Sequence, residues 1–428
     1  MTPAQLTAPL RPAARLRGTL TLPPDKSIAH RALIFAALSG GPSTVVMERP
    51  GHDVLSTVAC LRDLGLEIDE STSGQWKISG SPMRHATLDC GNSGTSMRLL
   101  AGMLAGLPLR ATLDGDASLR ARPMERVATL LRATGAEVTT TNGHAPITIS
   151  GRASPAATTH RLPVASAQLI GATVLTGLAA KGETRIEASG PTRDHTERML
   201  AWMGVPIGRA GFVTTLTGPA RPRPFELEVP GDPSAASAWL VAAALHPDAE
   251  IRMEQVGLNP TRLALVGLLQ RMGVEVETRI TDVAGPEPIG EINVRGGSAL
   301  HAVEIGGGEV AELIDELPLV AVAMASVDEP SELWDASELR VKETDRIGAV
   351  VRGLEAIGAR VEERADGWRV SRGTPRAAVI QTHGDHRIAI AFAIAAISGV
   401  ATAVELDDPD CTAVSYPTFW SDLAAVTA

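Results

Sequence analysis

Amphipathic stretches that end in a glycine recur along the chain. In each, a Leu- or Met-containing segment is followed by Gly and then by a strand-like residue pair, at intervals of about 70 to 85 residues. A glycine placed after helical spacing indicates a helix C-terminus, and the alternating residues after it predict a strand. The phrase occurs around Gly65, Gly135, Gly204, Gly273 and Gly358.

A second pattern lies between these phrases: a polar turn followed by an Ala- and Leu-rich helix. Its six occurrences begin at residues 25, 91, 166, 231, 314 and 384. These helices are apolar on nearly every face, which predicts that they lie in the interior with strands packed outside them. Ala-rich helices could resemble one another by chance, but two interleaved patterns favour six repeats of about 70 residues.

The length and the repeats together predict an α/β protein of two domains. A chain of 428 residues is too long for one core. We expect three repeats in each domain, with the chain crossing near Pro23-Pro24 and again near residues 229–233. Residues 24–232 would then form an inserted domain, and residues 1–23 plus 233–428 a discontinuous one.

Composition narrows the function classes. A formal charge of −10 and 3% aromatic residues argue against a nucleic-acid or anionic-membrane surface. No apolar run reaches membrane-spanning length, so we expect a cytoplasmic protein. The three cysteines show no paired spacing, which indicates a reducing compartment and no structural metal.

Three polar turns in the first half carry candidate anion-binding groups. Lys26 and Arg31 lie at the start of one helix, where the helix dipole attracts anions. Gly94 lies in a Gly-rich loop that lets backbone N–H groups approach an anion, and Gln168 opens a third helix. Ordinary helix capping with surface charges, or a tight turn, remains the alternative for each.

The second half adds a carboxylate and further cations. Asp315 enters an apolar helix, where burial would raise its pKa and suit it to proton abstraction; a helix N-cap is the alternative. Lys342 and Arg346 lie one helical turn apart, although a solvated charged face could look the same. Arg387 begins a wholly apolar helix and must point out of its start.

Equivalent ends of repeats face the same way, so these turns predict one cationic cleft between the two domains. Arg122, Arg193, Lys342 and Arg346 would add to it from connecting segments. In an acidic protein, such a cleft is suited to small, multiply charged anions, since each charged hydrogen bond contributes roughly 1.5 to 3 kcal/mol.

The motifs also carry a family resemblance over essentially the whole chain. DKSIAHR, GNSGTSMR, RPM, SAQ, TRDHTERM, GDPSAA, IDELP, LRVKETDRI, DHRIAIAF and VSYPTFW occur in the order and approximate spacing of the 5-enolpyruvylshikimate-3-phosphate (EPSP) synthase family. The resemblance implies two domains of three βαβαββ units. It also implies transfer of the enolpyruvyl group of phosphoenolpyruvate to the 5-hydroxyl of shikimate 3-phosphate, in the shikimate pathway, without metal or cofactor. We expect a monomer that acts on these two small molecules.

The resemblance assigns site residues by motif. Shikimate 3-phosphate contacts would be Lys26, Ser27, Arg31, Ser166, Ala167, Gln168, Arg193, Asp315 and Lys342. Phosphoenolpyruvate contacts would be Lys26, Gly94, Arg122, Gln168, Arg346 and Arg387. For catalysis, Asp315 would take the hydroxyl proton, and Lys26 or Glu343 would deliver a proton to carbon.

Three positions depart from common family patterns. Ala167 stands where many members have Ser, Val414 where they have Lys, and Ile170 where the class with the SAQ motif has Lys. The resemblance therefore implies one anion contact fewer where Val414 replaces Lys.

Three alternatives remain at this stage. A related UDP-N-acetylglucosamine enolpyruvyl transferase generally has a Cys in the loop that here spans residues 114–125 without one. A non-catalytic anion-binding repeat protein would bind ligand without turnover. An RNA-processing enzyme with the same repeat unit is disfavoured by the charge and the few aromatic residues.

Overall fold

The computed structural model describes residues 8–283 and 285–428, which form two compact units. The inserted unit comprises residues 24–229 and 285–287. The discontinuous unit comprises residues 8–23, 230–283 and 288–428. The chain thus passes between the units at residues 229/230, whereas the domain bounds expected from the sequence placed this crossing at 232/233. The short segment 285–287 belongs to the inserted unit, although the strands on either side of it, β15 and β16, belong to the discontinuous unit.

The inserted unit contains three similar repeats. The first has α1 (Lys26–Leu38), β2 (Ser43–Val46), α2 (His52–Asp63), β3 (Glu67–Thr72) and β4 (Gln75–Ser79), with β13 (Glu226–Glu228) added from the far end. The second has β5 (Ala86–Asp89), α3 (Gly94–Ala105), β6 (Arg110–Asp114), α4 (Ala117–Ala121), α5 (Glu125–Ala133), β7 (Glu137–Thr141) and β8 (His144–Ser150). The third has β9 (Thr159–Arg161), α6 (Ala167–Gly177), β10 (Gly182–Glu187), α7 (His195–Trp202), β11 (Ile207–Ala210) and β12 (Val213–Gly218).

Each repeat of this unit folds into a four-stranded mixed sheet. The strand orders are β13-β2-β4-β3, β5-β6-β8-β7 and β9-β10-β12-β11. The first two strands of each sheet pair in parallel, and the remaining strands pair antiparallel. In the second and third repeats a βαβ crossover is followed, after a further helix, by a hairpin, which is the predicted βαβαββ unit. In the first repeat, β13 from the far end of the unit takes the place of the opening strand.

The discontinuous unit repeats the pattern twice. The first copy has β1 (Leu16–Thr21), α8 (Pro233–Leu245), β14 (Ala249–Gly257), the 3₁₀ helix η2 (Pro260–Arg262), α9 (Ala264–Arg271), β15 (Glu275–Asp282) and β16 (Ile289–Arg295). The second has β17 (Glu304–Ile305), α10 (Gly308–Leu313), α11 (Leu317–Met324), β18 (Ser331–Leu333), η3 (Ser337–Val341), α12 (Arg346–Ala356), β19 (Arg360–Arg364) and β20 (Gly367–Ser371).

The last repeat departs from the prediction. It has β21 (Ala377–Ile380), α13 (His386–Ile397), β22 (Ala403–Leu406), η4 (Pro409–Val414) and α14 (Phe419–Thr427), and its sheet has only two strands among the described residues. Six complete βαβαββ copies were therefore too many. The sequence holds no sixth helix–Gly–strand phrase, and an aromatic helix ends the chain instead: the Phe419 ring stacks on Trp239 of α8 with centroids 5.7 Å apart.

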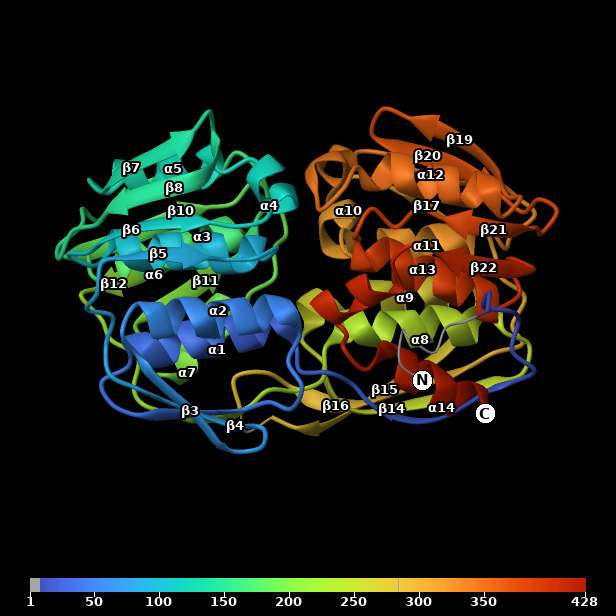
Figure 1. Cartoon of the computed structure of the whole chain (residues 1–428), viewed down its shortest axis with the longest axis horizontal. Helices are drawn as coiled ribbons and strands as arrows, with labels where there is room; N and C mark the ends of the chain where they lie inside the picture. Colours follow the sequence, from blue (N-terminus) through green and yellow to red (C-terminus); the bar gives the residue numbers. More distant parts are fainter. Residues whose placement is uncertain (1–7, 284) are drawn as a thin grey trace. The chain divides into compact units, whose positions relative to one another are not determined.

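The Ala- and Leu-rich helices lie inside each unit, as the sequence predicted (Figure 1). In the inserted unit these are α1, α3 and α6, and in the discontinuous unit α8, α11 and α13; nearly all of their residues are buried. Small residues permit the packing. A Cβ on Gly102 of α3 would lie 2.2 Å from the carbonyl oxygen of Ala172 on α6, so these two helices meet backbone to backbone.

The five predicted helix-ending glycines are confirmed. Each follows a helix by two residues, precedes a strand, and has a φ between 84° and 99°, a left-handed conformation that favours glycine. Among residues 8–283 and 285–428, no helix is long and apolar enough to cross a membrane.

Candidate active site

Four candidate site residues lie in the first turn of an Ala- and Leu-rich helix: Lys26 of α1, Gly94 of α3, Gln168 of α6 and Arg387 of α13. Five of the six such helices have a side-chain N-cap, from Asp25, Ser93, Ser166, Asp232 and Asp385. A helix start leaves backbone N–H groups unpaired and carries roughly half a positive charge. Each unit therefore places its predicted residues where anions are attracted.

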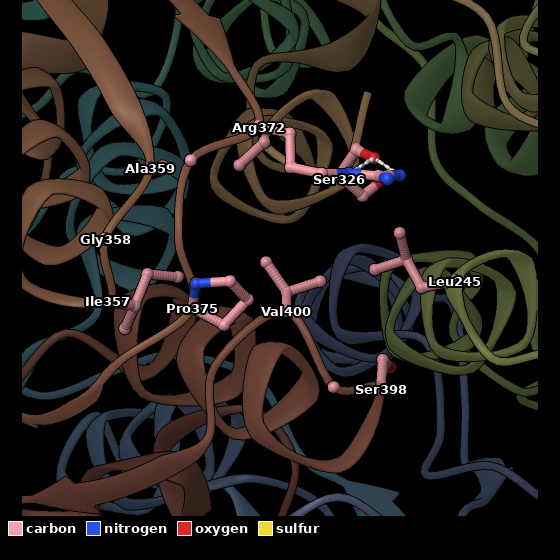
Figure 2. A pocket seen from close by; sticks show the side chains of 12 residues that line it. Leu245, Ser326, Ile357, Gly358, Ala359, Arg372, Pro375, Ser398 and Val400 are labelled. Atoms are coloured by element: carbon pink, nitrogen blue, oxygen red, sulfur yellow. Dashed lines mark hydrogen bonds between the residues drawn. The ribbon is translucent and has the colours of Figure 1, made fainter. Parts of the chain in front are cut away.

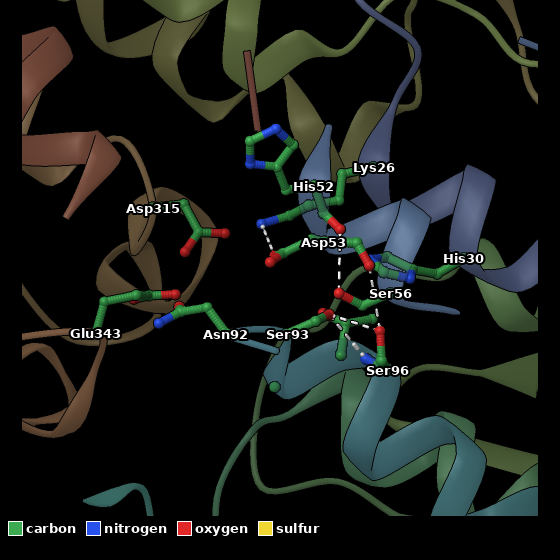
Figure 3. Close-up of polar contacts among 12 residues, drawn as sticks. Lys26, His30, His52, Asp53, Ser56, Asn92, Ser93, Ser96, Asp315 and Glu343 are labelled. Atoms are coloured by element: carbon green, nitrogen blue, oxygen red, sulfur yellow. Dashed lines mark hydrogen bonds and ion pairs between the residues drawn. The ribbon is translucent and has the colours of Figure 1, made fainter. Parts of the chain in front are cut away.

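Lys26 is the first residue of α1, and its partner is a carboxylate that the sequence did not single out. The Lys26 Nζ lies 3.1 Å from Oδ2 of Asp53, and both side chains are largely buried (Figure 3). Asp53 lies in the first turn of α2, a position where acidic residues are common for dipole reasons alone. The local pattern therefore gave no signal that it would meet Lys26.

Arg31 is buried one turn further along α1. Its Nε donates to Oγ1 of Thr196 at 2.8 Å, and its Nη1 donates to the Ser27 carbonyl at 2.9 Å. Burial lowers the pKa of Arg31 to about 10, against the opposing influence of Glu197 and Asp25. Arg193 lies near enough to contribute to this lowering, so the structure brings these two predicted cations together.

Gly94, Arg122 and Gln168 also come together in the inserted unit. A Cβ on Gly94 would lie 2.7 Å from Nη1 of Arg98 and 3.0 Å from Nη1 of Arg122. Arg98 donates to Oε1 of Gln168 at 2.8 Å, and Nε2 of Gln168 donates to Thr95. The glycine is thus required for two guanidinium groups to lie against the start of α3.

Two neutral residues complete this face. Asn92 accepts a hydrogen bond from Nη2 of Arg122 at 2.7 Å, a contact that the sequence analysis missed. Ser166 caps α6 by accepting from the Leu169 N–H at 3.4 Å, and Ala167 is the first residue of that helix. Ile170, the position where related sequences have Lys, is 2% exposed and part of the core.

In the discontinuous unit, carboxylates surround Arg346. Its Nε lies 2.8 Å from Oδ2 of Asp385, its Nη2 2.7 Å from Oε2 of Glu343, and its Nη1 3.8 Å from Oδ1 of Asp315. The side chain is 1% exposed. Burial alone would lower the pKa of Arg346, but the charges of Asp385 and Glu343 outweigh it and raise the pKa above its ordinary value.

The expectation that Asp315 is buried is wrong. Its side chain is 23% exposed in the turn between α10 and α11, with Nζ of Lys342 at 3.6 Å. The N-cap alternative also fails, because Glu316 occupies the cap position of α11. Lys342 and Arg346 thus flank the same carboxylate oxygen, at 3.6 and 3.8 Å.

Arg387 is the second residue of α13 and has an acidic partner of its own. Its Nη1 lies 3.8 Å from Oε1 of Glu316, and its backbone N–H donates to the cap residue Asp385 at 2.9 Å. The sequence identified Arg387 but not Glu316, which lies beside the more conspicuous Asp315.

The three cysteines are free and buried, and a hydrogen bond that the Cys90 thiol donates to Cys60, together with burial, raises the pKa of Cys90 well above its ordinary value. No group of three or more His, Cys, Asp or Glu side chains among the described residues could hold a metal ion.

A separate cavity lies at the other ends of the helices in the discontinuous unit. Figure 2 shows this space of about 260 Å³, which Leu245, Ala325, Ile357 and Ser398 line at the C-terminal ends of α8, α11, α12 and α13. Arg372 donates from Nε to the Ser326 carbonyl at 2.7 Å. Helix C-termini present carbonyl groups and repel anions, and the cavity contains none of the predicted site residues.

A family model for EPSP synthase (3-phosphoshikimate 1-carboxyvinyltransferase) matches residues 10–423. The chain belongs to this family. A 3-phosphoshikimate 1-carboxyvinyltransferase from Salinibacter ruber is 43% identical over 424 residues, covering 97% of this chain and 98% of the relative. One from Roseiflexus castenholzii is 44% identical over 424 residues, covering 96% and 97%.

Solved structures agree with this assignment. The structure of an EPSP synthase from Acinetobacter baumannii has a TM-score of 0.85 and 35% identity, and covers 98% of this chain and 97% of that one. The enolpyruvyl transferase NikO from Streptomyces tendae has a TM-score of 0.74 at 17% identity, which shows the fold alone. The predicted family is confirmed, and so is the α/β fold of repeated units, apart from the truncated last repeat.

Proposed function

We propose that this chain transfers the enolpyruvyl group of phosphoenolpyruvate to the 5-hydroxyl of shikimate 3-phosphate and releases phosphate. Membership of the EPSP synthase family over residues 10–423 carries this proposal. The structure adds support, since buried or half-buried cations lie at the helix starts of both units. The reaction is a step of the shikimate pathway to aromatic amino acids.

We assign most of the contacts with shikimate 3-phosphate to the inserted unit. Arg31 supports this role because its two hydrogen bonds go to neutral oxygens, so its charge stays available for a phosphate. Ser27, Ser166, Ala167, Gln168 and Arg193 would complete the contacts from the same unit, and Lys342 and Asp315 from the other. The predicted cleft between the domains stays a prediction on which this assignment depends.

Phosphoenolpyruvate is assigned to the guanidinium groups. Arg122 lies at the start of α3 beside Gly94, and Arg346 and Arg387 lie at the starts of α12 and α13. Fixed guanidinium groups hold a phosphate and a carboxylate in a defined orientation, which lowers the entropic cost of reaching the reacting geometry.

The proton transfers follow from the charges around the two carboxylates. Asp315, ionised beside Lys342 and Arg346, takes the proton of the 5-hydroxyl as its oxygen attacks carbon 2 of phosphoenolpyruvate. Glu343 lies 2.7 Å from Arg346, so we assign to it the positioning of that guanidinium. Lys26, whose ammonium lies 3.1 Å from Asp53, carries transferable protons, and we assign to it the proton that reaches the methylene carbon.

The second half of the reaction reverses these steps. The bond between carbon 2 and the phosphate oxygen breaks, and the methyl group returns one proton to the Lys26 amine. Phosphate leaves with the proton that Asp315 had taken. In this proposal Glu343 fixes Arg346 and does not move a proton, so Lys26 is preferred of the two acids that the sequence left open.

The decisive experiment measures phosphate release from phosphoenolpyruvate with either shikimate 3-phosphate or UDP-N-acetylglucosamine as the acceptor. We expect turnover with shikimate 3-phosphate only. Asp315→Asn and Lys26→Met should each lower kcat by about 100-fold or more, since positioned acid–base groups contribute that much. The exposed Asp328→Asn and Lys77→Met are matched controls that should retain full activity.

Other outcomes contradict parts of the proposal. Turnover with the nucleotide sugar would reject the acceptor, and binding of both substrates without turnover would reject the enzyme. A normal kcat for Asp315→Asn at saturating substrates would reject the base assignment alone.

A further inference from the structure

A chain of buried polar side chains leads to Arg387 within the discontinuous unit. Arg262, on η2, lies with its Nη2 2.9 Å from Oδ1 of Asp232 and donates to Oγ of Ser234 at 2.8 Å. Ser234 in turn donates to Oε1 of Glu316 at 2.5 Å. The same Oε1 lies 3.8 Å from Nη1 of Arg387.

The direction of these hydrogen bonds is fixed by chemistry. A guanidinium group can only donate, so the Ser234 oxygen must accept from Arg262, and its single hydrogen is left for Glu316. The side chains of Arg262, Asp232 and Glu316 are between 3% and 9% exposed, which makes each of these charged hydrogen bonds strong. The residues Asn259-Pro260-Thr261-Arg262 hold Arg262 in place. Asn259 caps η2 by accepting a hydrogen bond from the Thr261 N–H, and this fixes the short helix that carries Arg262.

This chain holds the Glu316 carboxylate away from Arg387. At 3.8 Å, the pair is longer than the 2.7 to 2.9 Å of a charge-assisted hydrogen bond. Opposite charges at this distance attract, so the pair would tend to shorten. The Ser234 hydroxyl, which itself accepts from a buried cation, competes for the carboxylate oxygen.

We propose that Ser234 is a positioning residue that tethers Glu316 and thereby keeps the Arg387 guanidinium available to the anionic substrate. Glu316 balances the charge of Arg387 without occupying its donors. The neighbouring carboxylates Asp315 and Glu316 thus have different proposed roles: Asp315 takes the hydroxyl proton, and Glu316 balances the charge of Arg387 from a distance of 3.8 Å. This inference rests on the proposed contact between Arg387 and phosphoenolpyruvate.

Ser234→Ala tests the tether. The substitution removes the 2.5 Å hydrogen bond to Glu316, so this carboxylate is expected to move toward Arg387 and to compete with phosphoenolpyruvate for one charged hydrogen bond. We expect the KM for phosphoenolpyruvate to rise about tenfold, with kcat and the KM for shikimate 3-phosphate within twofold of wild type. Ser237→Ala is the matched control: Ser237 lies on the same helix, is 3% exposed, and bonds only its own helix backbone at Pro233.

A second substitution separates positioning from a general loss of structure. In Ser234→Ala/Glu316→Gln the competing charge is gone, so the KM for phosphoenolpyruvate should return to within twofold of wild type. A merely structural network would make the double variant worse than the single one, and that result would overturn the proposal. So would an unchanged KM in Ser234→Ala.

Arg387→Gln distinguishes the failure of this inference from failure of the site assignment. If Arg387→Gln raises the KM for phosphoenolpyruvate and Ser234→Ala does not, the tether is wrong and the binding role stands. If Arg387→Gln leaves that KM unchanged, the binding role itself is wrong, and the tether falls with it.

Discussion

Replacing Asp385 by Asn removes the charge that best stabilises buried Arg346. Two hydrogen bonds, of 2.8 and 3.2 Å, join these side chains, and Asp385 is fully buried. Removing one partner of a buried ion pair costs about 3 to 5 kcal/mol. The low end applies here, because Glu343 still pairs with Arg346 and the amide oxygen of Asn can accept one bond.

The cap of α13 should survive this substitution. Asp385 accepts from the Arg387 N–H at 2.9 Å, and Asn is as good an N-cap as Asp. The expected decrease of about 3 kcal/mol in the free energy of unfolding therefore comes from the lost charge of Asp385 and not from a lost helix cap. Asp385→Ala should lower the free energy of unfolding by about 1 kcal/mol more than Asp385→Asn, since it removes the helix cap as well.

Hydrogen exchange measured by mass spectrometry suits this test, because two units need not unfold as one and a single transition would mix them. Peptides from α13 should exchange about 100-fold faster in Asp385→Asn, since 1.4 kcal/mol corresponds to a factor of ten. Peptides from α3 in the inserted unit should be unchanged. Asp248→Asn, which removes an exposed partner of Arg17, should leave α13 unaffected. Wild-type exchange of α13 in Asp385→Asn would refute the view that this carboxylate stabilises Arg346.

Two further predictions concern the inserted unit. Gly94→Ala should raise the KM for phosphoenolpyruvate about tenfold without changing the urea midpoint, because the added methyl meets the side-chain ends of Arg98 and Arg122. Steady-state kinetics test the KM and urea unfolding tests the stability; a lowered midpoint would contradict the prediction. Burial, with the charges of Lys26 and Arg31, lowers the pKa of His30 well below its ordinary value, so below pH 6.5 the unfolded chain binds a proton that the folded chain does not. Stability should fall as the pH drops from 7.5 to 5.5, and His30→Gln should flatten that slope in urea titrations at the two pH values; an equally steep slope would show that other groups cause it.

The repeats were predictable because their signals are local. A glycine after an amphipathic segment specifies a left-handed turn wherever it occurs, and the five such glycines located the helix ends and strand starts. The truncated final repeat could have been anticipated from the missing sixth glycine. The run of apolar residues in α13 looked like the other central helices and concealed the difference.

The site was only partly predictable, because its pairings are long-range. Lys26 and Arg387 stood out as cations at helix starts, but nothing near them in sequence identified Asp53 or Glu316 as their partners. Asp315 was expected to be buried because the residues after it are apolar. Its side chain instead leaves the turn before α11 and meets Lys342, which a one-dimensional pattern cannot reveal.

The opposite pKa shifts of two buried arginines distinguish two ways of presenting a cation to an anionic substrate. Arg346 is surrounded by carboxylates, its pKa is raised, and its charge is already balanced. Such a group gains little from binding another anion, and its value lies in fixed orientation. Arg31 has neutral hydrogen-bond partners, and burial lowers its pKa to about 10. If Arg31 binds the phosphate of shikimate 3-phosphate as proposed, that phosphate adds a charged hydrogen-bond partner to the through-space influence of Glu197 and Asp25, and the pKa of Arg31 should rise.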